Sequence, residues 1–588
     1  MRQAASFRAF LLGFFLVFSA PLPAQAKCVL GKVAELPVTM DGLKPLASFG
    51  INGKNVQLMI DSGAFYSILA TSKAKELKLP QDFLPLSLQG IGGYADASYT
   101  TVQKFTIAGV DLNKVDFIVA STLGLDGVLG QNFLGPFDVE YDLPHGYVRL
   151  FKPHDCGDVR LDYWSTDKLS GLIKIDRMED RNRHTTGAAE INGQRISVIF
   201  DTGASTSVIR RGAAERAGVS INDPHTVYLG QIGGLGGGKI DTWIAPIQNF
   251  KLGDEEIRNT KISVASLQLD TDMLLGADFF ISHRVLVSNS QRKLYFTYEG
   301  GPIFNAPVAT REKDADGKGE HDVKVAGSVE AEPTDADGYS RRGAAEMGRK
   351  EYDKALADLD KAVALAPQEA KYVQERAGAH LALKQSFLAM ADLDRAMKLK
   401  GNDGAILVSR ALLKISGHDY EGAVSDLQTA AIAVSAQSNL RLTIGKLFSA
   451  ARRPDLAPAE LDLWQANHPD DANLEPMFSE RCWARGLTAT DLDKALKDCD
   501  RAIAISPKLA VPRSNRGLIH LRRKEYDLAL ADYNAALAIN PTLPWALYGR
   551  GLVLKATGKD DLAKADLDKA VATRDRLKEE AALYHLTP

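Results

Sequence analysis

One block of thirteen residues occurs twice in the chain, and it limits the possible folds more strongly than any other feature. Residues 52–64 read NGKNVQLMIDSGA and residues 192–204 read NGQRISVIFDTGA, so the Asn-Gly pair and the aspartate recur 140 positions later. An Asn-Gly pair is typical of a tight turn, and the apolar run after it is typical of a buried strand. Each copy therefore predicts a strand that ends at an aspartate, Asp61 in the first copy and Asp201 in the second.

The sequences that follow the two blocks also match. A glycine-rich turn comes about 30 residues after each aspartate, at 90–96 and at 231–241, and an apolar-apolar-Gly triplet comes later, ending at Gly130 and at Gly276. A single Asp-Ser/Thr-Gly triplet is ordinary turn chemistry, and a chain of this length contains about 0.3 of them by chance. Two copies with matched flanks indicate a duplicated β domain.

The whole chain of 588 residues divides into three parts by composition. From about 28 to 300, short alternating runs rich in Val, Ile, Phe, Thr and Gly predict β structure. Residues 301–337 are poor in apolar side chains and rich in small and charged ones, which predicts a flexible linker. Beyond the linker, Ala, Leu, Asp, Lys and Arg recur with helical spacing.

The helical part repeats every 34 residues. Segments ALADLDKA, AMADLDRA and AVSDLQTA begin at 355, 389 and 423, and ALKDCDRA, ALADYNAA and AKADLDKA begin at 495, 529 and 563. Residues 457–464 form a worn copy between them. This pattern resembles the tetratricopeptide repeat family over roughly 338–575. The resemblance implies an all-α solenoid of helical hairpins whose concave face binds a protein partner or peptide.

An arginine and an aspartate also recur in the repeats. The arginines are Arg342, Arg376, Arg410, Arg481, Arg516 and Arg550, and the aspartates are Asp358, Asp392, Asp426, Asp498, Asp532 and Asp566. They could line a basic groove for acidic peptides or form one ion pair within each hairpin. We favour the ion pair, because both members are replaced together in the worn copy, by Ile444 and Glu460.

The order of motifs in the β part resembles the retropepsin-like aspartic protease family, over about 33–152 and 171–298. The resemblance implies two tandem all-β domains, at 28–156 and 160–300, that each donate one catalytic aspartate, Asp61 and Asp201. Whether the two meet within one chain or between two swapped chains stays open at this stage. The remaining roles carried over are dyad support by Ser62, Gly63, Thr202 and Gly203, flaps at Gly90, Gly92, Gly93, Tyr94, Gly233, Gly234 and Gly236, and structural loops at Gly130 and Gly276.

Such a dyad has a defined chemistry. Two carboxylates about 3 Å apart cannot both ionise, so the pair holds one shared proton. The charged member can act as a base on a water molecule while the protonated member polarises the carbonyl of a peptide bond. We expect no cofactor and no metal, because His145, His154, His184 and His225 do not have the spacing of a metal site.

The first 26 residues have the pattern of a signal peptide. Arg2 and Arg8 precede an apolar core at 10–18, and Ala24-Gln25-Ala26 forms a small-x-small cleavage site. The apolar core of nine residues is shorter than the roughly 20 that a membrane-spanning helix needs. We therefore expect an exported protein, periplasmic or alternatively secreted, with no membrane span after cleavage.

The cysteines bear on the redox compartment of the protein, and the net charge bears on its class of partner. Cys28 and Cys156 bracket the first β domain, and Cys482 and Cys499 lie within one helical hairpin, so each couple is either a disulfide or a pair of buried thiols. The formal net charge of −3 and the absence of a dense Lys/Arg run argue against a nucleic-acid partner.

Two functions fit these patterns. The first is an exported aspartic endopeptidase that uses Asp61 and Asp201 on a protein or peptide substrate, with the solenoid recruiting that substrate or a partner. The alternative is a non-catalytic periplasmic adaptor, in which the repeats bind protein and the β domains are a structural or pseudo-protease platform. The two intact aspartate motifs favour the enzyme, since a platform needs neither carboxylate.

Overall fold

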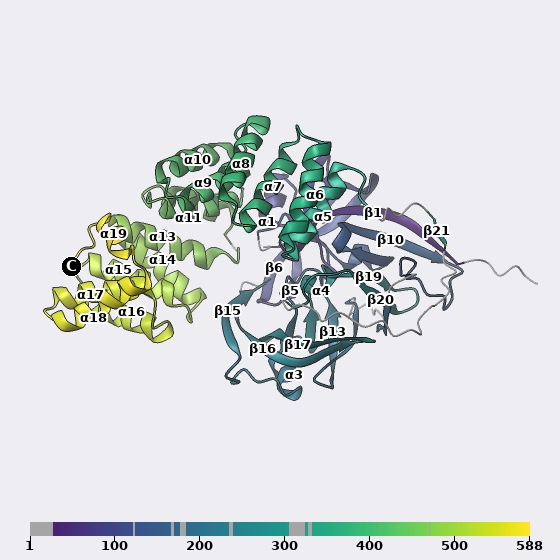
Figure 1. Cartoon of the computed structure of the whole chain (residues 1–588), viewed down its shortest axis with the longest axis horizontal. Helices are drawn as coiled ribbons and strands as arrows, with labels where there is room; N and C mark the ends of the chain where they lie inside the picture. The colour runs from purple at the N-terminus through teal and green to yellow at the C-terminus, as the bar shows by residue number, and fades with distance from the viewer. Residues whose placement is uncertain are drawn as a thin grey trace, which may run out of the picture.

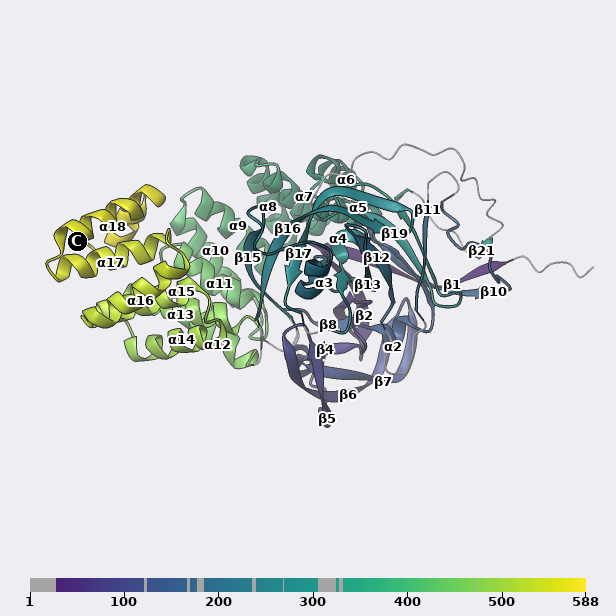
Figure 2. The same cartoon turned by 90° about the horizontal axis from the view of Figure 1, so that it is seen from below.

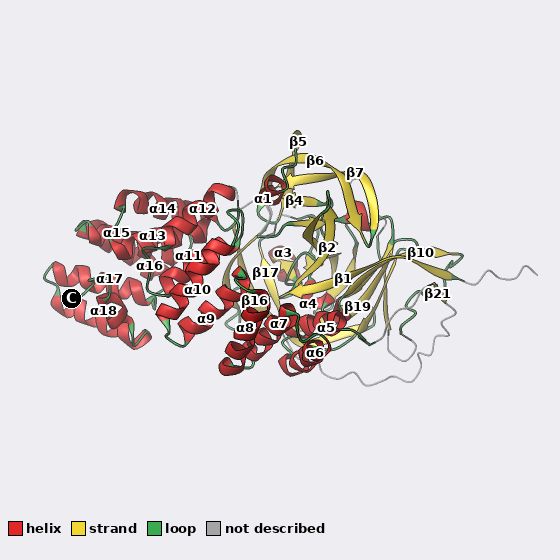
Figure 3. Cartoon of the chain, turned by 90° about the horizontal axis from the view of Figure 1, so that it is seen from above, coloured by secondary structure: helices red, strands yellow, loops and turns green. Residues whose placement is uncertain are grey.

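The computed structural model describes residues 28–120, 124–165, 170–176, 184–234, 239–267, 269–304, 324–326, 332–469 and 471–588. The N-terminal half is built mainly from strands and the C-terminal half from helices; the first helices, α5 to α7 (residues 336–382), lie over the β half, and the later ones extend to one side of it (Figures 1 and 3). The fold class predicted from the sequence, two β domains followed by an α solenoid, is confirmed. The predicted signal peptide at 1–26 lies outside the described residues.

The first β domain consists of strands in which buried and exposed side chains alternate, as in β3, where Val56 and Leu58 are buried and Lys54 and Gln57 are not. Its elements are β1 (Val29–Asp41), β2 (Lys44–Ile51), β3 (Lys54–Ile60), β4 (Ile68–Ala70), α1 (Thr71–Glu76), β5 (Asp82–Gly90), β6 (Gly93–Ile107), β7 (Val110–Ala120), β8 (Gly127–Leu129), α2 (Gln131–Leu134), β9 (Asp138–Asp142), the 3-10 turn η1 (Leu143–His145) and β10 (Tyr147–His154).

The second β domain repeats this order. Its elements are β11 (Ser170–Lys174), β12 (Thr186–Ile191), β13 (Gln194–Phe200), β14 (Val208–Arg210), α3 (Arg211–Arg216), β15 (Val227–Gly233), β16 (Lys239–Leu252), β17 (Glu255–Ala265), β18 (Met273–Leu275), α4 (Ala277–Phe280), β19 (His283–Ser288) and β20 (Lys293–Tyr298). Each domain pairs its aspartate-bearing strand in parallel with a short strand, β3 with β8 and β13 with β18. The duplication in the sequence is therefore a duplication of topology.

A continuous sheet joins the two domains within one chain. Strand β19 pairs antiparallel with β9, with Leu286 opposite Glu140, so the sheet runs in the order β11, β20, β19, β9, β10, β1. Glu140 is fully buried there and accepts hydrogen bonds from Arg149 at 2.6 Å and from Arg284 at 2.8 Å. Because Arg284 belongs to the second domain and Glu140 to the first, this charge cluster binds the two halves together.

Part of the segment predicted as a flexible linker is ordered against the β domains. Strand β21 (Lys324–Ala326) pairs in parallel with β1, and Ile303 and Phe304 are buried in the β core. The outer edge of β1 offers unpaired backbone groups, which a passing segment can satisfy whatever its side chains. Composition alone does not reveal this. Residues 305–323 and 327–331 lie outside the described part of the chain.

The solenoid consists of helical hairpins with small side chains at the crossings, for example Ala355 and Ala362, both fully buried. Its helices are α5 (Ala336–Gly348), α6 (Tyr352–Leu365), α7 (Ala370–Ala382), α8 (Ser386–Lys400), α9 (Gly404–Ser416), α10 (Tyr420–Ala433), α11 (Leu440–Ala450), α12 (Ala457–Asn467), α13 (Leu474–Thr488), α14 (Leu492–Ile505), α15 (Ala510–Arg522), α16 (Tyr526–Ile539), α17 (Pro544–Ala556), α18 (Asp560–Thr573) and α19 (Leu577–Ala582). No helix in the described ranges has the length and apolar character that crossing a bilayer requires.

The recurring arginine and aspartate form an ion pair inside each hairpin, as the sequence predicted. In the α7–α8 hairpin, for example, Arg376 donates to both oxygens of Asp392, at 2.8 and 2.7 Å. The worn copy differs from the prediction, because its pair is not lost. There Arg441, one helical turn before Ile444, donates to Glu460 at 2.5 Å. The ion pair is thus structural, and the arginine has moved by one turn of α11.

Among the described residues, the solenoid contacts the β half at several places, and β15 lies beside its helices in Figures 1 and 2. The first helix, α5, packs on β1 and η1, where Arg341 donates to the hydroxyl of Tyr147 at 2.7 Å and Ala345 joins the β core; Figures 1 and 3 show α5 beside β1. Further along, Lys508 forms an ion pair with Asp241 on β16. The solenoid therefore lies against the second flap hairpin as well as against the inter-domain sheet.

The four cysteines form two disulfides, Cys28 with Cys156 and Cys482 with Cys499. The first closes a loop of 128 residues and ties the beginning of β1 to the end of the first β domain. The second joins α13 to α14.

Candidate active site

Each candidate aspartate follows the last residue of a strand, β3 or β13, that is hydrogen-bonded to a short parallel strand, β8 or β18. The backbone N–H of Asp61 donates to the carbonyl of Leu129 at 3.0 Å, and that of Asp201 donates to the carbonyl of Leu275 at 2.9 Å. These bonds continue the parallel β3–β8 and β13–β18 pairs by one residue. The chain then turns sharply, so that each carboxyl group projects from a fixed loop.

The two carboxyl groups meet between the loops. A β-carbon placed on Gly63 would lie 2.2 Å from Cγ of Asp201, and one placed on Gly203 would lie 2.3 Å from Cγ of Asp61. Any larger residue at either glycine would therefore displace the opposite aspartate. The two side chains are also hydrogen-bonded to each other, while both keep partial exposure to solvent. The dyad forms within one chain.

Ser62 and Thr202 brace the two loops against each other. The backbone N–H of Ser62 donates to Oγ1 of Thr202 at 3.0 Å, and the backbone N–H of Thr202 donates to Oγ of Ser62 at 2.9 Å. Each hydroxyl then donates across the domain boundary to a strand carbonyl, Ser62 to Phe200 and Thr202 to Ile60, both at 2.8 Å. All four bonds are buried, and together they fix the separation of the carboxyl groups.

Burial raises the pKa of both aspartates, and the two differ. Burial and then the charge of Asp201 hold the pKa of Asp61 well above its usual range, although Asp61 accepts the backbone N–H groups of Ala64 and Gly63. Burial also raises the pKa of Asp201, but its own loop N–H groups, the hydrogen bond from Asp61 and the charge of His184 oppose the rise. With both pKa values raised, the pair holds one shared proton near neutral pH, and its titration belongs to the two carboxyl groups together.

The flap candidates lie at two hairpin tips that touch. In the first, Gly90 pairs with Gly93 across a two-residue tip, and the Tyr94 side chain is 71% exposed. In the second, Gly233 pairs with Lys239, and a β-carbon on Gly234 would lie 3.0 Å from Cβ of Ile91 in the first flap. The flaps therefore meet through Ile91 and Gly234. Gly236 lies outside the described residues.

The loop glycines Gly130 and Gly276 lie where the backbone is too crowded for a side chain. A β-carbon on Gly130 would lie 2.6 Å from the carbonyl of Tyr66, and one on Gly276 would lie 2.6 Å from the carbonyl of Ala204. Both glycines hold the chain tightly behind the aspartate loops. No group of three or more His, Cys, Asp or Glu side chains suited to a metal occurs in the described ranges.

Comparison with known families gives the same division of the chain. A family model described as aspartyl protease matches residues 47–133 and 188–279, and one described as TPR repeat matches residues 517–558. The chain carries two aspartyl protease-like domains and a tetratricopeptide-repeat solenoid.

Similar solved structures are tetratricopeptide-repeat proteins and assemblies, and no curated protein matches the chain. YrrB, described as a TPR protein with an unusual peptide-binding site, is 18% identical with a TM-score of 0.28, over 33% of this chain and 97% of YrrB. A tetratricopeptide repeat protein from Parabacteroides merdae is 15% identical with a TM-score of 0.35, over 42% and 98%. The APC/C hetero-tetramer Cut9-Hcn1 is 18% identical with a TM-score of 0.33, over 43% of this chain and 49% of that one.

The aspartyl protease-like domains contain one residue at the dyad that the sequence patterns did not single out, His184. Strand β12 pairs with β13 with Thr186 opposite Ile199, and the carbonyl of Thr185 accepts from Phe200, which places His184 across from Asp201. The ring of His184 hydrogen-bonds to the backbone of Gly63, and burial lowers its pKa. Counting residues outward from the Asn192-Gly193 turn also pairs His184 with Asp201. The position of His184 beside the dyad could therefore have been predicted from the hairpin sequence.

A second asymmetry lies behind the two loops. In the first protease-like domain, Oδ1 of Asn132 accepts from the backbone and hydroxyl of Ser67, both at 2.8 Å. In the second, Asp278 takes that place and accepts from the backbone and hydroxyl of Ser207, at 2.9 and 2.6 Å. Burial raises the pKa of Asp278 to about 6. The second domain therefore carries a titratable group where the first has a neutral amide.

Proposed function

We propose that the protein is an exported aspartic endopeptidase in which Asp61 and Asp201 activate water for the hydrolysis of a peptide bond. The observation that carries this proposal is the meeting of the two carboxyl groups, each held by the glycine N–H of its own loop and packed against the glycine of the opposite loop. A platform without catalytic function has no physical need for this arrangement, because holding two carboxyl groups in contact in a buried site costs stability.

The two carboxyl groups take different roles in this reaction, one as a general base and one as a general acid. The ionised member of the Asp61/Asp201 pair accepts a proton from water, and the water oxygen attacks the carbonyl carbon of the peptide bond. The protonated member gives its proton to the carbonyl oxygen, which forms a neutral tetrahedral intermediate. On collapse, the first carboxyl group gives the captured proton to the leaving nitrogen, and the second takes its proton back from the hydroxyl. Both carboxyl groups therefore return to their starting states.

The flaps are suited to an extended substrate. The hairpin β5–β6 and the hairpin β15–β16 meet through Ile91 and Gly234, so they must part for a chain to reach the dyad. Backbone groups on such hairpins can add hydrogen bonds to an extended peptide without regard to its side chains. A polypeptide is the substrate class that fits.

We further propose that the protein is exported and that its solenoid recruits a protein substrate or partner. The N-terminal pattern at 1–26 and two disulfides both fit an oxidising compartment such as the periplasm. The covalently attached solenoid would raise the local concentration of a bound protein near the dyad. The ion pair between Lys508 of the solenoid and Asp241 of the second flap hairpin supports this role, because it brings the solenoid next to that hairpin.

Cleavage of an unfolded protein tests the proposal. Wild-type protein, Asp61→Asn, Asp201→Asn and the control Asp223→Asn are compared from acidic to neutral pH. Asp223 is exposed on a surface turn, so its substitution leaves the dyad intact. We expect wild type and the control to cleave and each dyad variant to lose about three orders of magnitude in rate or more. Equal cleavage by all four, or no cleavage by wild type at any pH, overturns the proposal.

A further inference from the structure

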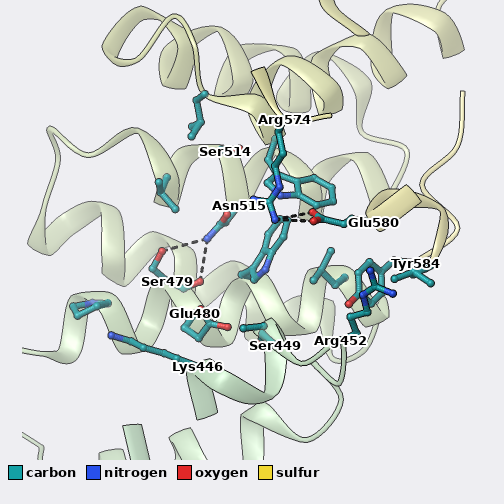
Figure 4. Close-up of a pocket in the computed structure, with 18 of the residues that line it drawn as sticks. Lys446, Ser449, Arg452, Ser479, Glu480, Ser514, Asn515, Arg574, Glu580 and Tyr584 are labelled. Carbon is teal, nitrogen blue, oxygen red and sulfur yellow. Dashed lines mark hydrogen bonds and ion pairs between the residues drawn. The ribbon is translucent and has the colours of Figure 1, made fainter. Parts of the chain in front are cut away.

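A cavity of about 560 Å³ lies in the solenoid, outside the protease-like domains. Its walls come from α11, α13, α15 and α17, the first helices of successive hairpins, and from the segment around α19 (Figure 4). The volume falls in the range of about 300–1,000 Å³ that is usual for ligand sites. We call this cavity the solenoid chamber.

The last described segment closes one side of the chamber. Arg522 donates to the carbonyl of Tyr584 at 2.6 Å, and the hydroxyl of Tyr548 donates to the carbonyl of Leu586 at 3.1 Å. The loop before α19 also reaches back to the third hairpin, where Arg576 lies 2.9 Å from Nε2 of His418. The concave face is therefore partly enclosed at this end, so the chamber suits a single side chain or a short segment.

Two buried polar atoms inside the chamber have little to satisfy them beyond each other. Oε1 of Glu480 and Oγ of Ser449 make no well-formed hydrogen bond to another described residue, although the Ser449 hydroxyl lies close enough to Glu480 to lower the pKa of its carboxyl group. Both residues line the chamber and lie next to each other in Figure 4. Burial outweighs this contact and raises the pKa of Glu480 to about 7. A carboxylate and a hydroxyl can each accept further hydrogen bonds, so a donor from outside the chain is a natural additional partner for both oxygens.

The aromatic side chains beside Glu480 suit a cation with an alkyl stem. The rings of Trp483 and Trp545 both line the chamber, with centroids 4.8 Å apart and planes at 71°. Indole faces attract ammonium groups and also cover methylene groups well.

The chamber is short of positive charge around Glu480. Arg574 is paired with Glu580 at 2.8 Å. The guanidinium of Arg452 lies over the ring of Tyr420, 4.0 Å from its centroid. That leaves Lys446, among the described chamber residues, to face both Glu475 and Glu480, and Figure 4 shows its amine pointing away from the Glu480 carboxyl group.

We propose that the solenoid chamber binds the side chain of a lysine on a protein partner, with its ammonium between Glu480 and Ser449 and its methylenes against Trp483 and Trp545. This deepens the recruiting role proposed for the solenoid and names the chemistry that it recognises. An acidic segment is disfavoured, because it would bring more negative charge next to the buried carboxyl group of Glu480.

Binding of short capped peptides to the full chain tests this inference. The probes are acetyl-Ala-Lys-Ala-amide and its norleucine and glutamate analogues, which keep the length and change the charge. Tryptophan fluorescence and calorimetry give the dissociation constants. For wild type we expect the lysine peptide to bind about tenfold more tightly than the norleucine peptide or better, since hydrogen bonds to charged groups are the strong ones.

Glu480→Gln is the decisive variant, and Glu369→Gln, at an exposed position outside the chamber, is its control. The lysine preference should vanish in Glu480→Gln and persist in Glu369→Gln. Equal unfolding midpoints of the two variants show that both are folded. Survival of the preference in Glu480→Gln, or stronger binding of the glutamate peptide, overturns the inference.

Two further ligands test whether the chamber recognises a lysine side chain or any ammonium group. Spermidine and an uncapped Ala-Nle-Ala peptide offer amines without a lysine, and binding of either as tight as that of the lysine peptide refutes the assignment. All measurements are repeated in Asp61→Asn. Binding there is expected to be unchanged, so a failure of the endopeptidase proposal and a failure of the lysine site give different results.

Discussion

Replacing Thr202 by valine tests whether the cross-domain brace holds the dyad. Valine keeps the shape of threonine and removes one hydroxyl, which accepts from the N–H of Ser62 at 3.0 Å and donates to the carbonyl of Ile60 at 2.8 Å. Leaving a buried N–H unpaired costs about 1–3 kcal/mol, and losing the bond to the carbonyl adds about 0.5–1.5 kcal/mol. The expected loss is about 3 kcal/mol, which lowers Tm by about 6–12 °C for a unit of this size.

Two matched variants separate the brace from the loss of a buried hydroxyl in general. Thr202→Ser keeps the hydroxyl, so most of the stability should remain. Thr100→Val makes the same chemical change at a fully buried threonine whose hydroxyl has no hydrogen-bond partner in the described part of the chain. We expect Thr100→Val to be neutral or slightly stabilising, because no partner is left unpaired.

Scanning calorimetry and peptide hydrolysis are the two assays. Besides the shift in Tm, Thr202→Val should lower kcat by about 10- to 100-fold, because a small displacement of one loop misaligns the carboxyl groups. The reasoning is refuted if Thr202→Val unfolds within about 0.5 kcal/mol of Thr202→Ser and of Thr100→Val, which is the usual error of such comparisons.

Three other substitutions test separate parts of the structure. Asp61→Asn should flatten the pH dependence of stability: since burial raises the folded-state pKa of Asp61, the wild type loses stability as pH rises from about 4 towards neutral, and urea unfolding at several pH values measures this. His184→Gln removes a charge that lowers the pKa of Asp201, so the acidic limb of the pH–rate profile should move to higher pH. Glu140→Gln should cost about 3–5 kcal/mol in denaturant unfolding, because it breaks a buried cluster and leaves two arginines poorly paired.

The substitutions of His184 and Glu140 each have a control in the same protein. His225→Gln alters an exposed histidine away from the dyad and should leave the pH–rate profile in place. Glu215→Gln breaks an exposed ion pair with Arg211 and should cost about 1 kcal/mol or less. The prediction for Asp61 is wrong if Asp61→Asn keeps the pH dependence of stability of the wild type. The prediction for His184 is wrong if the pH–rate profile of His184→Gln does not move. The prediction for Glu140 is wrong if Glu140→Gln loses no more free energy of unfolding than Glu215→Gln.

Local patterns were enough to predict the elements and the pairs that lie close in sequence. The Asn-Gly turns and apolar runs predicted strands ending at Asp61 and Asp201, because a hairpin and a strand depend on neighbouring residues. The repeated arginine and aspartate were predicted as ion pairs for the same reason, since the two lie on adjacent helices of one hairpin. The worn copy escaped this reasoning, because a one-turn shift to Arg441 keeps the same helical face but breaks the sequence register.

The duplicated aspartate blocks determined that the chain would carry two matching half-sites, and the 34-residue repeats determined that a helical solenoid would follow. Only the tertiary structure decided that Asp61 and Asp201 meet in one chain, that Arg284 closes on Glu140, and that the segment after α19 encloses the chamber around Glu480. Spacing along a chain fixes short-range geometry, because it depends on backbone angles over a few residues. Contacts between segments more than 100 residues apart depend on how whole domains pack, and no local pattern encodes that packing by itself.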